Sequence, residues 1–190
     1  DIDGDALTFS LDTDATNGSV VIDGSFATYT PDANYNGDDS FTFSVSDGEL
    51  SASATVTLTV TAVNDAPVLA SVSNVSFDED GSGSTSLSAS DVDGDDLSYS
   101  ITGGSDISAS LSGIDVSFSA PLNYNGSEEF SVSVSDGEYS DSQSITVIVN
   151  AVNDAPVANA TSSETSEDQS VVVSLSGSDI DGDNLTFSLD

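Results

Sequence analysis

Aspartates recur in one short motif, Asp-x-Asp-Gly-Asp, which begins at Asp1, Asp91 and Asp179. Side-chain amides recur as well, because an Asn-Tyr-Asn-Gly motif begins at Asn34 and again at Asn123. Carboxylate and amide oxygens are the ligands of hard cations, and calcium takes about six to eight of them in flexible geometry. These residue types therefore predict calcium binding.

The composition excludes most other chemistry. The 190 residues include 34 Asp and Glu and no Lys, Arg, His or Cys, so the formal net charge is −34. A chain without cationic side chains cannot neutralise phosphates, so nucleic acid and anionic membrane surfaces are excluded as partners. Without Cys or His there is no thiol nucleophile, no Ser-His dyad and no ordinary zinc, copper or haem site. All apolar runs are far shorter than the roughly 18 residues of a membrane span, so no membrane insertion is expected.

The motifs follow one period, which indicates tandem modules. The Asn-Tyr-Asn-Gly motif recurs after 89 residues, and so do the segments 45–49 (Val-Ser-Asp-Gly-Glu) and 62–68 (Ala-Val-Asn-Asp-Ala-Pro-Val). Self-similarity at a fixed period is the signature of repeated structural units. We expect a module that lacks its first strands over 1–63, a complete module over 64–152, and the start of a third module over 153–190.

Two explanations for the incomplete modules stay open. In the first, the chain is a window of a longer repetitive protein. In the second, the C-terminal partial module supplies strands to the N-terminal partial module of a neighbouring copy, as in donor-strand filaments.

Within each module, β-branched and aromatic residues alternate with Ser and Thr. Phe41, Phe43 and Val45 alternate in this way, and a period of two indicates a strand with one buried face. No segment has a sustained 3.6-residue stripe, so almost no helix is expected. About seven short strands in a module of about 89 residues predict an all-β fold of tandem Greek-key immunoglobulin-like sandwiches. The other expected strands are residues 54–60, 72–77, 85–90, 97–101, 107–111, 116–120, 130–134 and 145–149.

The motifs, in this order, resemble the cadherin-like tandem repeats of very large bacterial surface and secreted proteins. Residues 88–101 are similar to the cadherin stretch that carries the Asp-x-Asp calcium ligands, and residues 75–79 resemble the region with the calcium-binding Glu. Residues 134–137 resemble the Asp-Gly turn that supplies another ligand, and residues 152–156 resemble the linker between repeats. The resemblance implies calcium-binding sandwiches on an extracellular or bacterial cell-surface protein.

Transferred residue by residue, the resemblance implies calcium ligands at two junctions between modules. The first set is Asn34, Asn36, Asn64, Asp65, Asp91, Asp93 and Asp136. The second set is Glu79, Asn123, Asn125, Asn153, Asp154, Asp179 and Asp181. Animal cadherins have an Asp-Arg-Glu triplet where this chain has Asn-Tyr-Asn, so neutral amides replace charged ligands there. Because each set includes residues of two modules and their connector, bound calcium would fix the angle between the modules.

Each motif also has a purely structural interpretation. For Asp-x-Asp-Gly-Asp the alternative is an Asx turn with solvated acids, and for Asn-Tyr-Asn-Gly it is a tight turn in which Gly37 and Gly126 adopt positive φ. An EF-hand is not expected, because the twelfth residue from Asp91 is Thr102 rather than Glu. Paired carboxylates can hydrolyse glycosides, but acids that repeat in every module do not indicate a single catalytic pair. No enzyme is therefore expected.

The leading hypothesis is a calcium-rigidified extender, or stalk, of a large bacterial adhesin or extracellular filament. Its partners are then the adjacent modules of the same long chain. Two alternatives stay open: an adhesive module that binds a polysaccharide or another copy of itself, and a filament subunit whose copies exchange strands. Aromatic residues lie mostly at inward-alternating positions and Trp is absent, which favours the extender over a polysaccharide-binding surface.

Overall fold

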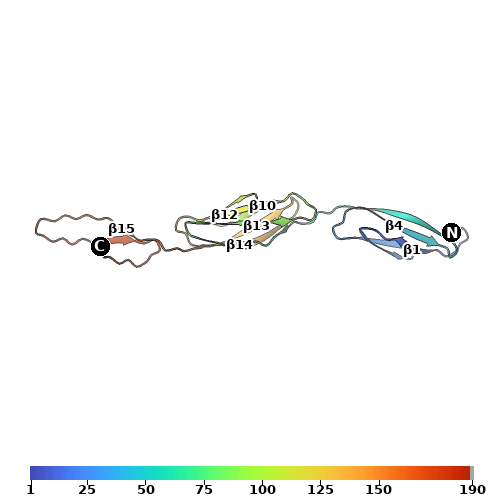
Figure 1. Cartoon of the computed structure of the whole chain (residues 1–190), viewed down its shortest axis with the longest axis horizontal. Coiled ribbons are helices and arrows are strands. Elements are labelled where there is room, and N and C mark those ends of the chain that lie inside the picture. The colour runs from blue at the N-terminus through green and yellow to red at the C-terminus, as the bar shows by residue number, and fades with distance from the viewer. Residues whose placement is uncertain (189–190) are drawn as a thin grey trace. The chain divides into compact units, whose positions relative to one another are not determined.

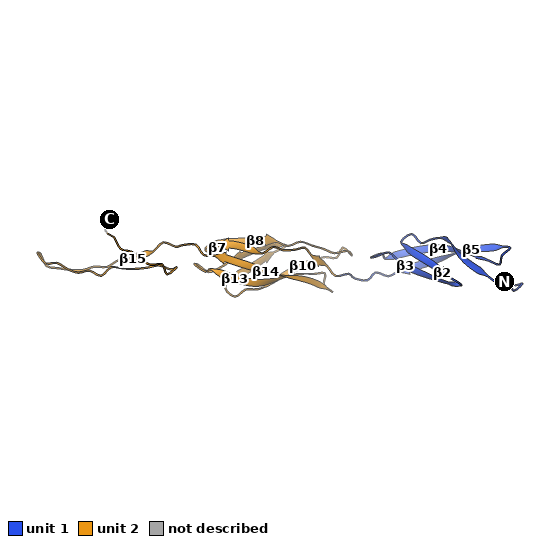
Figure 2. Ribbon diagram, turned by 90° about the horizontal axis from the view of Figure 1, so that it is seen from below, with its two compact units in different colours: residues 1–65 blue, residues 66–190 orange. Residues whose placement is uncertain are grey.

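The computed structural model describes residues 1–188, which form β-strands and loops in two compact units (Figures 1 and 2). Unit 1 is Asp1–Asp65 and unit 2 is Ala66–Asp190. Residues 1–188 contain no helix, and hence none long and apolar enough to cross a membrane. The prediction of an all-β chain is confirmed.

Unit 1, blue in Figure 2, contains a three-stranded sheet and a hairpin. The sheet is antiparallel with the order β1-β4-β5, and β2 pairs with β3 in the hairpin. In the sheet, Phe41 of β4 lies opposite Val56 of β5. The strands are β1 (Thr8–Thr13), β2 (Gly18–Asp23), β3 (Phe26–Pro31), β4 (Gly37–Ser46) and β5 (Ser51–Val60).

Unit 2 contains a two-sheet sandwich. One sheet has the order β10-β13-β14-β7, in which β7 runs parallel to β14, and the other has the order β11-β12-β8. A short pair, β6 with β9, accompanies them. The strands are β6 (Val68–Leu69), β7 (Val75–Asp78), β8 (Ser82–Ser86), β9 (Ala89–Ser90), β10 (Ser98–Gly103), β11 (Ser108–Ser112), β12 (Asp115–Ser119), β13 (Gly126–Ser135) and β14 (Ser140–Asn150).

The core of unit 2 follows from the period-two pattern of its strands. Val132 and Val134 of β13 are 0% exposed, whereas the serines between them face outwards or lie near the surface. The rings of Phe118 and Phe130 meet edge to face, with centroids 5.2 Å apart. Alternation thus places the aromatic and β-branched side chains between the sheets, where burial of apolar area stabilises the sandwich.

Of the expected strands, one is divided in the structure and another begins later than expected. The single strand expected over 85–90 is divided into β8 and β9, because β8 pairs with β12 and β9 pairs with β6. Leu87, between them, is 1% exposed. The strand expected from residue 72 begins at Val75 instead, because the side chain of Gln143 satisfies the backbone of Val72. The Val72 N–H donates to Gln143 Oε1 at 2.9 Å, and Gln143 Nε2 donates to the Val72 carbonyl at 3.2 Å.

Residues 153–188 of unit 2 contain one antiparallel pair of strands, β15 (Val157–Asn159) and β16 (Ser176–Ser178). The segment before β16 has an apolar alternation of its own. Val171, Val173 and Leu175 are 45%, 40% and 57% exposed, and residues 169–178 carry no charge.

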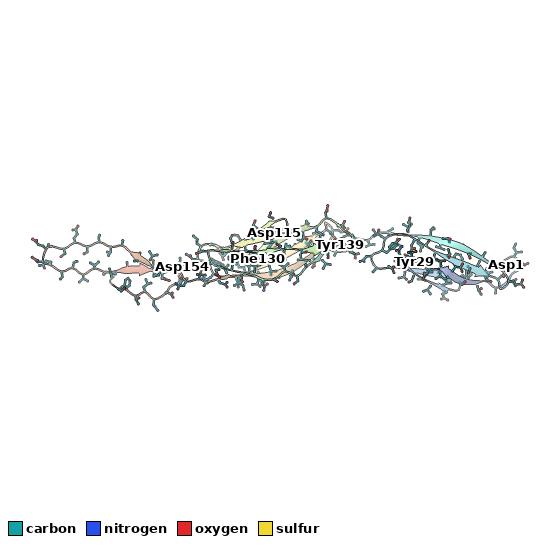
Figure 3. All side chains as sticks on the ribbon, in the orientation of Figure 1. Asp1, Tyr29, Asp115, Phe130, Tyr139 and Asp154 are labelled. Carbon is teal, nitrogen blue, oxygen red and sulfur yellow. The ribbon has the colours of Figure 1, made fainter. Side chains whose placement is uncertain are left out.

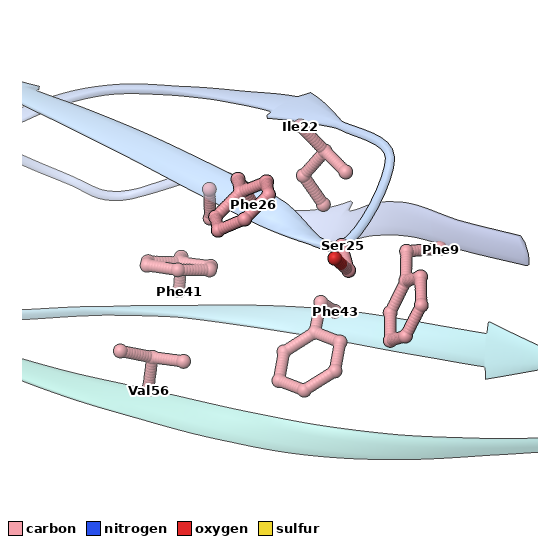
Figure 4. A pocket seen from close by; sticks show the side chains of 8 residues that line it. Phe9, Ile22, Ser25, Phe26, Phe41, Phe43 and Val56 are labelled. Carbon is pink, nitrogen blue, oxygen red and sulfur yellow. The ribbon is translucent and has the colours of Figure 1, made fainter.

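The inner face of unit 1 is more open than the equivalent face of unit 2. Val56 on β5 is half-buried, whereas Ile145, 89 residues later on β14, is 1% exposed. In unit 2, β7 lies beside β14 and β8 lies beside β12, but among the described residues of unit 1 no strand takes these places beside β5 and β3. The result is an apolar cleft of about 210 Å³ (Figure 4), lined by Phe9, Ile22, Ser25, Phe26, Ala27, Phe41, Phe43 and Val56.

Candidate metal centre

The second Asp-x-Asp-Gly-Asp motif folds into a tight loop around one carboxylate. Asp91 Oδ1 accepts hydrogen bonds from the N–H groups of Asp93 at 2.9 Å and Gly94 at 3.1 Å. Gly94 has φ +80°, a conformation that favours glycine. The loop brings carboxylate oxygens of Asp91, Asp93 and Asp95 within 4.8 Å of one another. The Asx turn of the structural interpretation is therefore present, and it brings the three carboxylates together.

The same loop forms in the other copies of the motif. Asp1 Oδ1 accepts from the N–H of Asp3 at 2.7 Å, and Asp179 Oδ1 accepts from that of Asp181 at 3.0 Å. In each case one carboxylate oxygen of the leading Asp is used for the turn. The second oxygen of Asp91, Oδ2, is buried and accepts no hydrogen bond from residues 1–188. A buried oxygen without a hydrogen-bond partner costs free energy, and formation of the turn does not explain why Oδ2 has none.

At the second predicted junction, Glu79 follows β7 and turns inwards. Its N–H donates to the Asn150 carbonyl at 2.9 Å, and its Oε1 accepts the Val152 N–H at 2.5 Å. The residue is only 7% exposed. Its other oxygen, Oε2, is buried and has no hydrogen-bond partner within the described chain. Glu79 thus presents an unpaired carboxylate oxygen directly beside the connector that leads into residues 153–188.

Asp154, labelled in Figure 3, presents a second such oxygen. Its backbone N–H donates to Asp181 Oδ2 at 2.7 Å, while its own Oδ2 is buried and unpaired among the described residues. Burial raises the pKa of Asp154 above its ordinary value, and neighbouring carboxylates raise it further. These neighbours, in order of decreasing effect, are Asp181, Asp80, Glu79 and Asp179. The centre is an anionic cluster in a chain without Lys, Arg or His.

Asn123 joins this cluster from the turn before β13. It has φ +56° and lines an open cleft of about 440 Å³ together with Asp154 and Asp179. Its backbone N–H donates to Asp80 Oδ1 at 2.9 Å. Asn153, in the connector, donates from Nδ2 to the Asp154 carbonyl at 3.0 Å. Asn125 is exposed, and no described contact brings it into the cleft.

The residues predicted for the first junction are divided between the units. In unit 1, Asn34 has φ +60° like Asn123, and Asn64 is half-buried. In unit 2, Asp136 Oδ1 accepts from the N–H groups of Glu138 at 2.7 Å and Tyr139 at 2.6 Å, as expected for a hairpin-turn residue. A shared site of these residues stays a prediction. The other members are Asn36 and Asp65 in unit 1 and Asp91 and Asp93 in unit 2.

A family model described as a bacterial Ig domain matches residues 64–148 and 153–190, more than half of the chain. The chain belongs to this bacterial Ig-domain family. A second model, described as a cadherin-like domain, matches residues 1–61, so the resemblance seen in the motifs is confirmed. Domains of these kinds are typically extracellular or surface-exposed and non-catalytic, and cadherin-like domains commonly bind calcium.

Solved structures similar to this bacterial Ig-domain chain include cadherins and one kind of enzyme. Human protocadherin-24 EC1-2 is 28% identical with a TM-score of 0.42, over 62% of this chain and 61% of that one. Drosophila N-cadherin EC1-4 is 15% identical with a TM-score of 0.43, over 83% and 44%. An endo-fucoidan hydrolase of glycoside hydrolase family 107 is 25% identical with a TM-score of 0.37, over 80% of this chain and 24% of that one. A comparison with curated proteins found no match.

Three carboxylates with fixed roles were not predicted. Asp80 holds the Asn123 turn, as described above. Asp39 and Glu128, 89 residues apart, each anchor a loop from a partly or fully buried strand position. Glu128 accepts the N–H groups of Asp106 at 3.0 Å and Ile107 at 3.1 Å, and Asp39 accepts that of Asn17 at 2.9 Å. The recurrence of an acid at this spacing, in an otherwise apolar alternation, is the signal that could have identified the pair.

Proposed function

We propose that this bacterial Ig-domain chain is a calcium-stiffened extender of an extracellular bacterial surface protein, without catalytic activity. Its modules serve as spacers whose relative orientation is set by calcium at the junction after the complete module. Within unit 2, the ligands are Glu79 and Asn123 from the sandwich and Asp154, Asp179 and Asp181 from the connector and the following loop.

One observation carries the proposal: Glu79 Oε2 and Asp154 Oδ2 are both buried without a hydrogen-bond partner among the described residues. A buried, unpaired carboxylate oxygen is costly, and two of them in one anionic cluster repel each other. Coordination to a divalent cation would satisfy such oxygens and offset their repulsion. Carboxylate and amide oxygens without His or Cys are the donor set of calcium rather than of zinc or copper.

The chain's own contacts explain how binding would stiffen the junction. Glu79 already holds the connector through the Val152 N–H, and Asp181 holds it through the Asp154 N–H. The strand pair in the following segment places Asp179 directly after β16. When bound, calcium supplies a shared positive charge that removes the repulsion among these carboxylates. The sandwich, the connector and the next loop would then be linked through the ion in addition to these two hydrogen bonds.

Small-angle X-ray scattering of the 190-residue chain, in millimolar calcium and then in chelator, tests the proposal. We expect the maximum dimension and stiffness to fall on chelation. An Asp179→Asn, Asp181→Asn double variant should behave as chelated protein at any calcium concentration, and an Asp23→Asn, Asp115→Asn variant, changed in exposed strand positions, should behave as wild type. Scattering that is indifferent to calcium would refute the proposal.

A second candidate function is strand exchange between copies, and the open apolar cleft of unit 1 favours it. In unit 2, β8 pairs with β12 and is followed by the buried Leu87. The segment 170–175 aligns with β8 and Leu87, and it places Val171, Val173 and Leu175 where Gly83, Thr85 and Leu87 lie. Paired with β3 of a second copy, this uncharged segment would cover the cleft, as β8 covers the equivalent face.

Sedimentation velocity over a concentration series tests this second candidate. We expect the wild-type chain to associate head to tail as the concentration rises. Val173→Asp should abolish association because the side chain would enter the apolar cleft. Val172→Asp is the matched control, since Val172 is 95% exposed and alternates to the other face. Purely monomeric wild-type protein would refute strand exchange.

A further inference from the structure

Asp80 joins two turns that are 43 residues apart in sequence. The first turn follows β7 and is closed by the Gly81 N–H donating to the Asp78 carbonyl at 3.0 Å. The second precedes β13 and is closed by the Tyr124 N–H donating to the Pro121 carbonyl at 3.2 Å. The 2.9 Å hydrogen bond from the Asn123 N–H to Asp80 Oδ1 is the link between them.

Each linked turn lies next to one candidate ligand of the calcium centre. Glu79 immediately precedes Asp80, and Asn123 lines the cleft with Asp154 and Asp179. The Asp80 carboxylate thus fixes the separation of the turn that follows Glu79 and the turn that contains Asn123. A hydrogen bond to an ionised acceptor is shorter and stronger than one between neutral groups.

The hydrogen bond is not needed to form either turn. Asn34 adopts φ +60° in the equivalent turn of unit 1, where residues 1–65 contain no counterpart of the turn after β7. Asp168 adopts φ +61° in the later copy of the Asp80 turn, closed by the Gln169 N–H donating to the Ser166 carbonyl at 3.2 Å. Both turns therefore fold on local preferences, since Asn and Asp tolerate this conformation. The Asp80 hydrogen bond adds a fixed distance between the two turns.

We propose that Asp80 is a positioning residue of the calcium centre: its Oδ1 holds the Asn123 turn against Glu79, and calcium binds weakly when this hydrogen bond is lost. This inference rests on the proposed function, because it concerns the affinity of that same site. Partners that orient metal ligands typically change metal affinity by about 10- to 100-fold when removed.

Two substitutions at Asp80 separate the hydrogen bond from the charge. Asp80→Asn keeps an acceptor oxygen and tolerates φ +63°, but it removes the charge. Asp80→Gly also tolerates this φ, but it removes the acceptor. Asp168→Gly is the control, because it makes the same change in a turn of the same conformation with no Asn-Tyr-Asn turn following it in residues 169–188.

Residue-resolved NMR on the 190-residue chain supplies the readouts. Hydrogen exchange of the Asn123 amide in chelator reports the tether, and shifts of the Asp154 and Asp181 amides during calcium titration report the site. We expect Asp80→Asn to stay within about threefold of wild-type affinity, and Asp80→Gly to bind about 10- to 100-fold more weakly with an unprotected Asn123 amide. Asp168→Gly should match wild type.

Each other outcome has a defined meaning. Wild-type affinity in Asp80→Gly would overturn the positioning role while leaving the calcium centre intact. Equal weakness of Asp80→Asn and Asp80→Gly would also overturn it, because charge and not the hydrogen bond would then matter. If wild-type protein shows no calcium-dependent shift at Asp154 and Asp181, the proposed function itself fails and this inference fails with it.

Discussion

Glu79→Gln is expected to lower stability only when calcium is present. The amide keeps an acceptor oxygen for the Val152 N–H, so the connector contact survives. In place of the unpaired Oε2, however, it puts an amide nitrogen that cannot bind calcium. The substitution therefore removes one ligand atom and one negative charge and leaves the shape of the residue almost unchanged.

The magnitude follows from binding linkage. For an extracellular module with a Kd of about 0.1 mM, about 10 mM calcium stabilises the folded state by about 2.7 kcal/mol. If losing a ligand weakens binding about 100-fold, the remaining stabilisation is about 0.4 kcal/mol. The variant should thus lose about 2.3 kcal/mol in calcium, or roughly 5–10 °C in Tm for a unit of this size. In chelator it should be no less stable than wild type, because Glu79 no longer repels Asp154.

Calorimetric unfolding of the 190-residue chain, in calcium and in chelator, measures the two differences. Glu167→Gln is the matched control, because Glu167 has the equivalent place in the following segment and is exposed. An equal loss of Tm in both buffers would refute the reasoning, since Glu79 would then act through its protein contacts alone.

Three further predictions concern the sandwiches. Leu87→Ala, at a side chain 1% exposed, should cost unit 2 about 2–5 kcal/mol in a urea titration and leave the transition of unit 1 unchanged. Hydrogen bonds from Ser105, Asp106 and Ile107 hold the pKa of Glu128 at about 2, below its ordinary 4.5. The stability that this carboxylate contributes should be complete above pH 4.5 and lost as the pH falls towards 2, and Glu128→Gln should flatten that part of an acid-unfolding curve. Burial and the hydrogen bond to Asp39 raise the pKa of Tyr29 to about 12, so ultraviolet titration should show late tyrosine ionisation, and Asp39→Asn should shift the Tyr29 part of it down.

Much of the fold could be predicted because apolar and polar residues alternate along each strand, and this pattern is local in sequence. Phe130, Val132 and Val134 repeat at every second position, and the structure buries all of them. The division of residues 82–90 into β8 and β9 could not be predicted in this way. It depends on which strands lie alongside, β12 for one and β6 for the other, and those partners are far away in sequence.

The candidate site also has residues that could be predicted from the sequence and residues that could not. Residue types predicted calcium, and the resemblance to cadherin-like repeats implied Glu79, Asp154 and Asp179 as candidate ligands. Asp80 did not stand out, since one more acid in a chain with 34 of them carries no signal. Its role depends on a hydrogen bond to Asn123 that exists only after two turns meet.

The sequence by itself determined that the chain repeats, that its modules are made of strands, and that calcium is the cation its donors suit. Each of these follows from residue composition or from the order of residues along the chain, and both can be analysed without the folded structure. Only the tertiary structure decided which carboxylate oxygens are used for turns and which stay buried and unpaired. Asp91 Oδ1 caps its own loop while Oδ2 does not, and Glu79 Oε1 holds Val152 while Oε2 does not. Such differences between two oxygens of one side chain arise from packing across the sandwich, and no pattern along the chain encodes them separately.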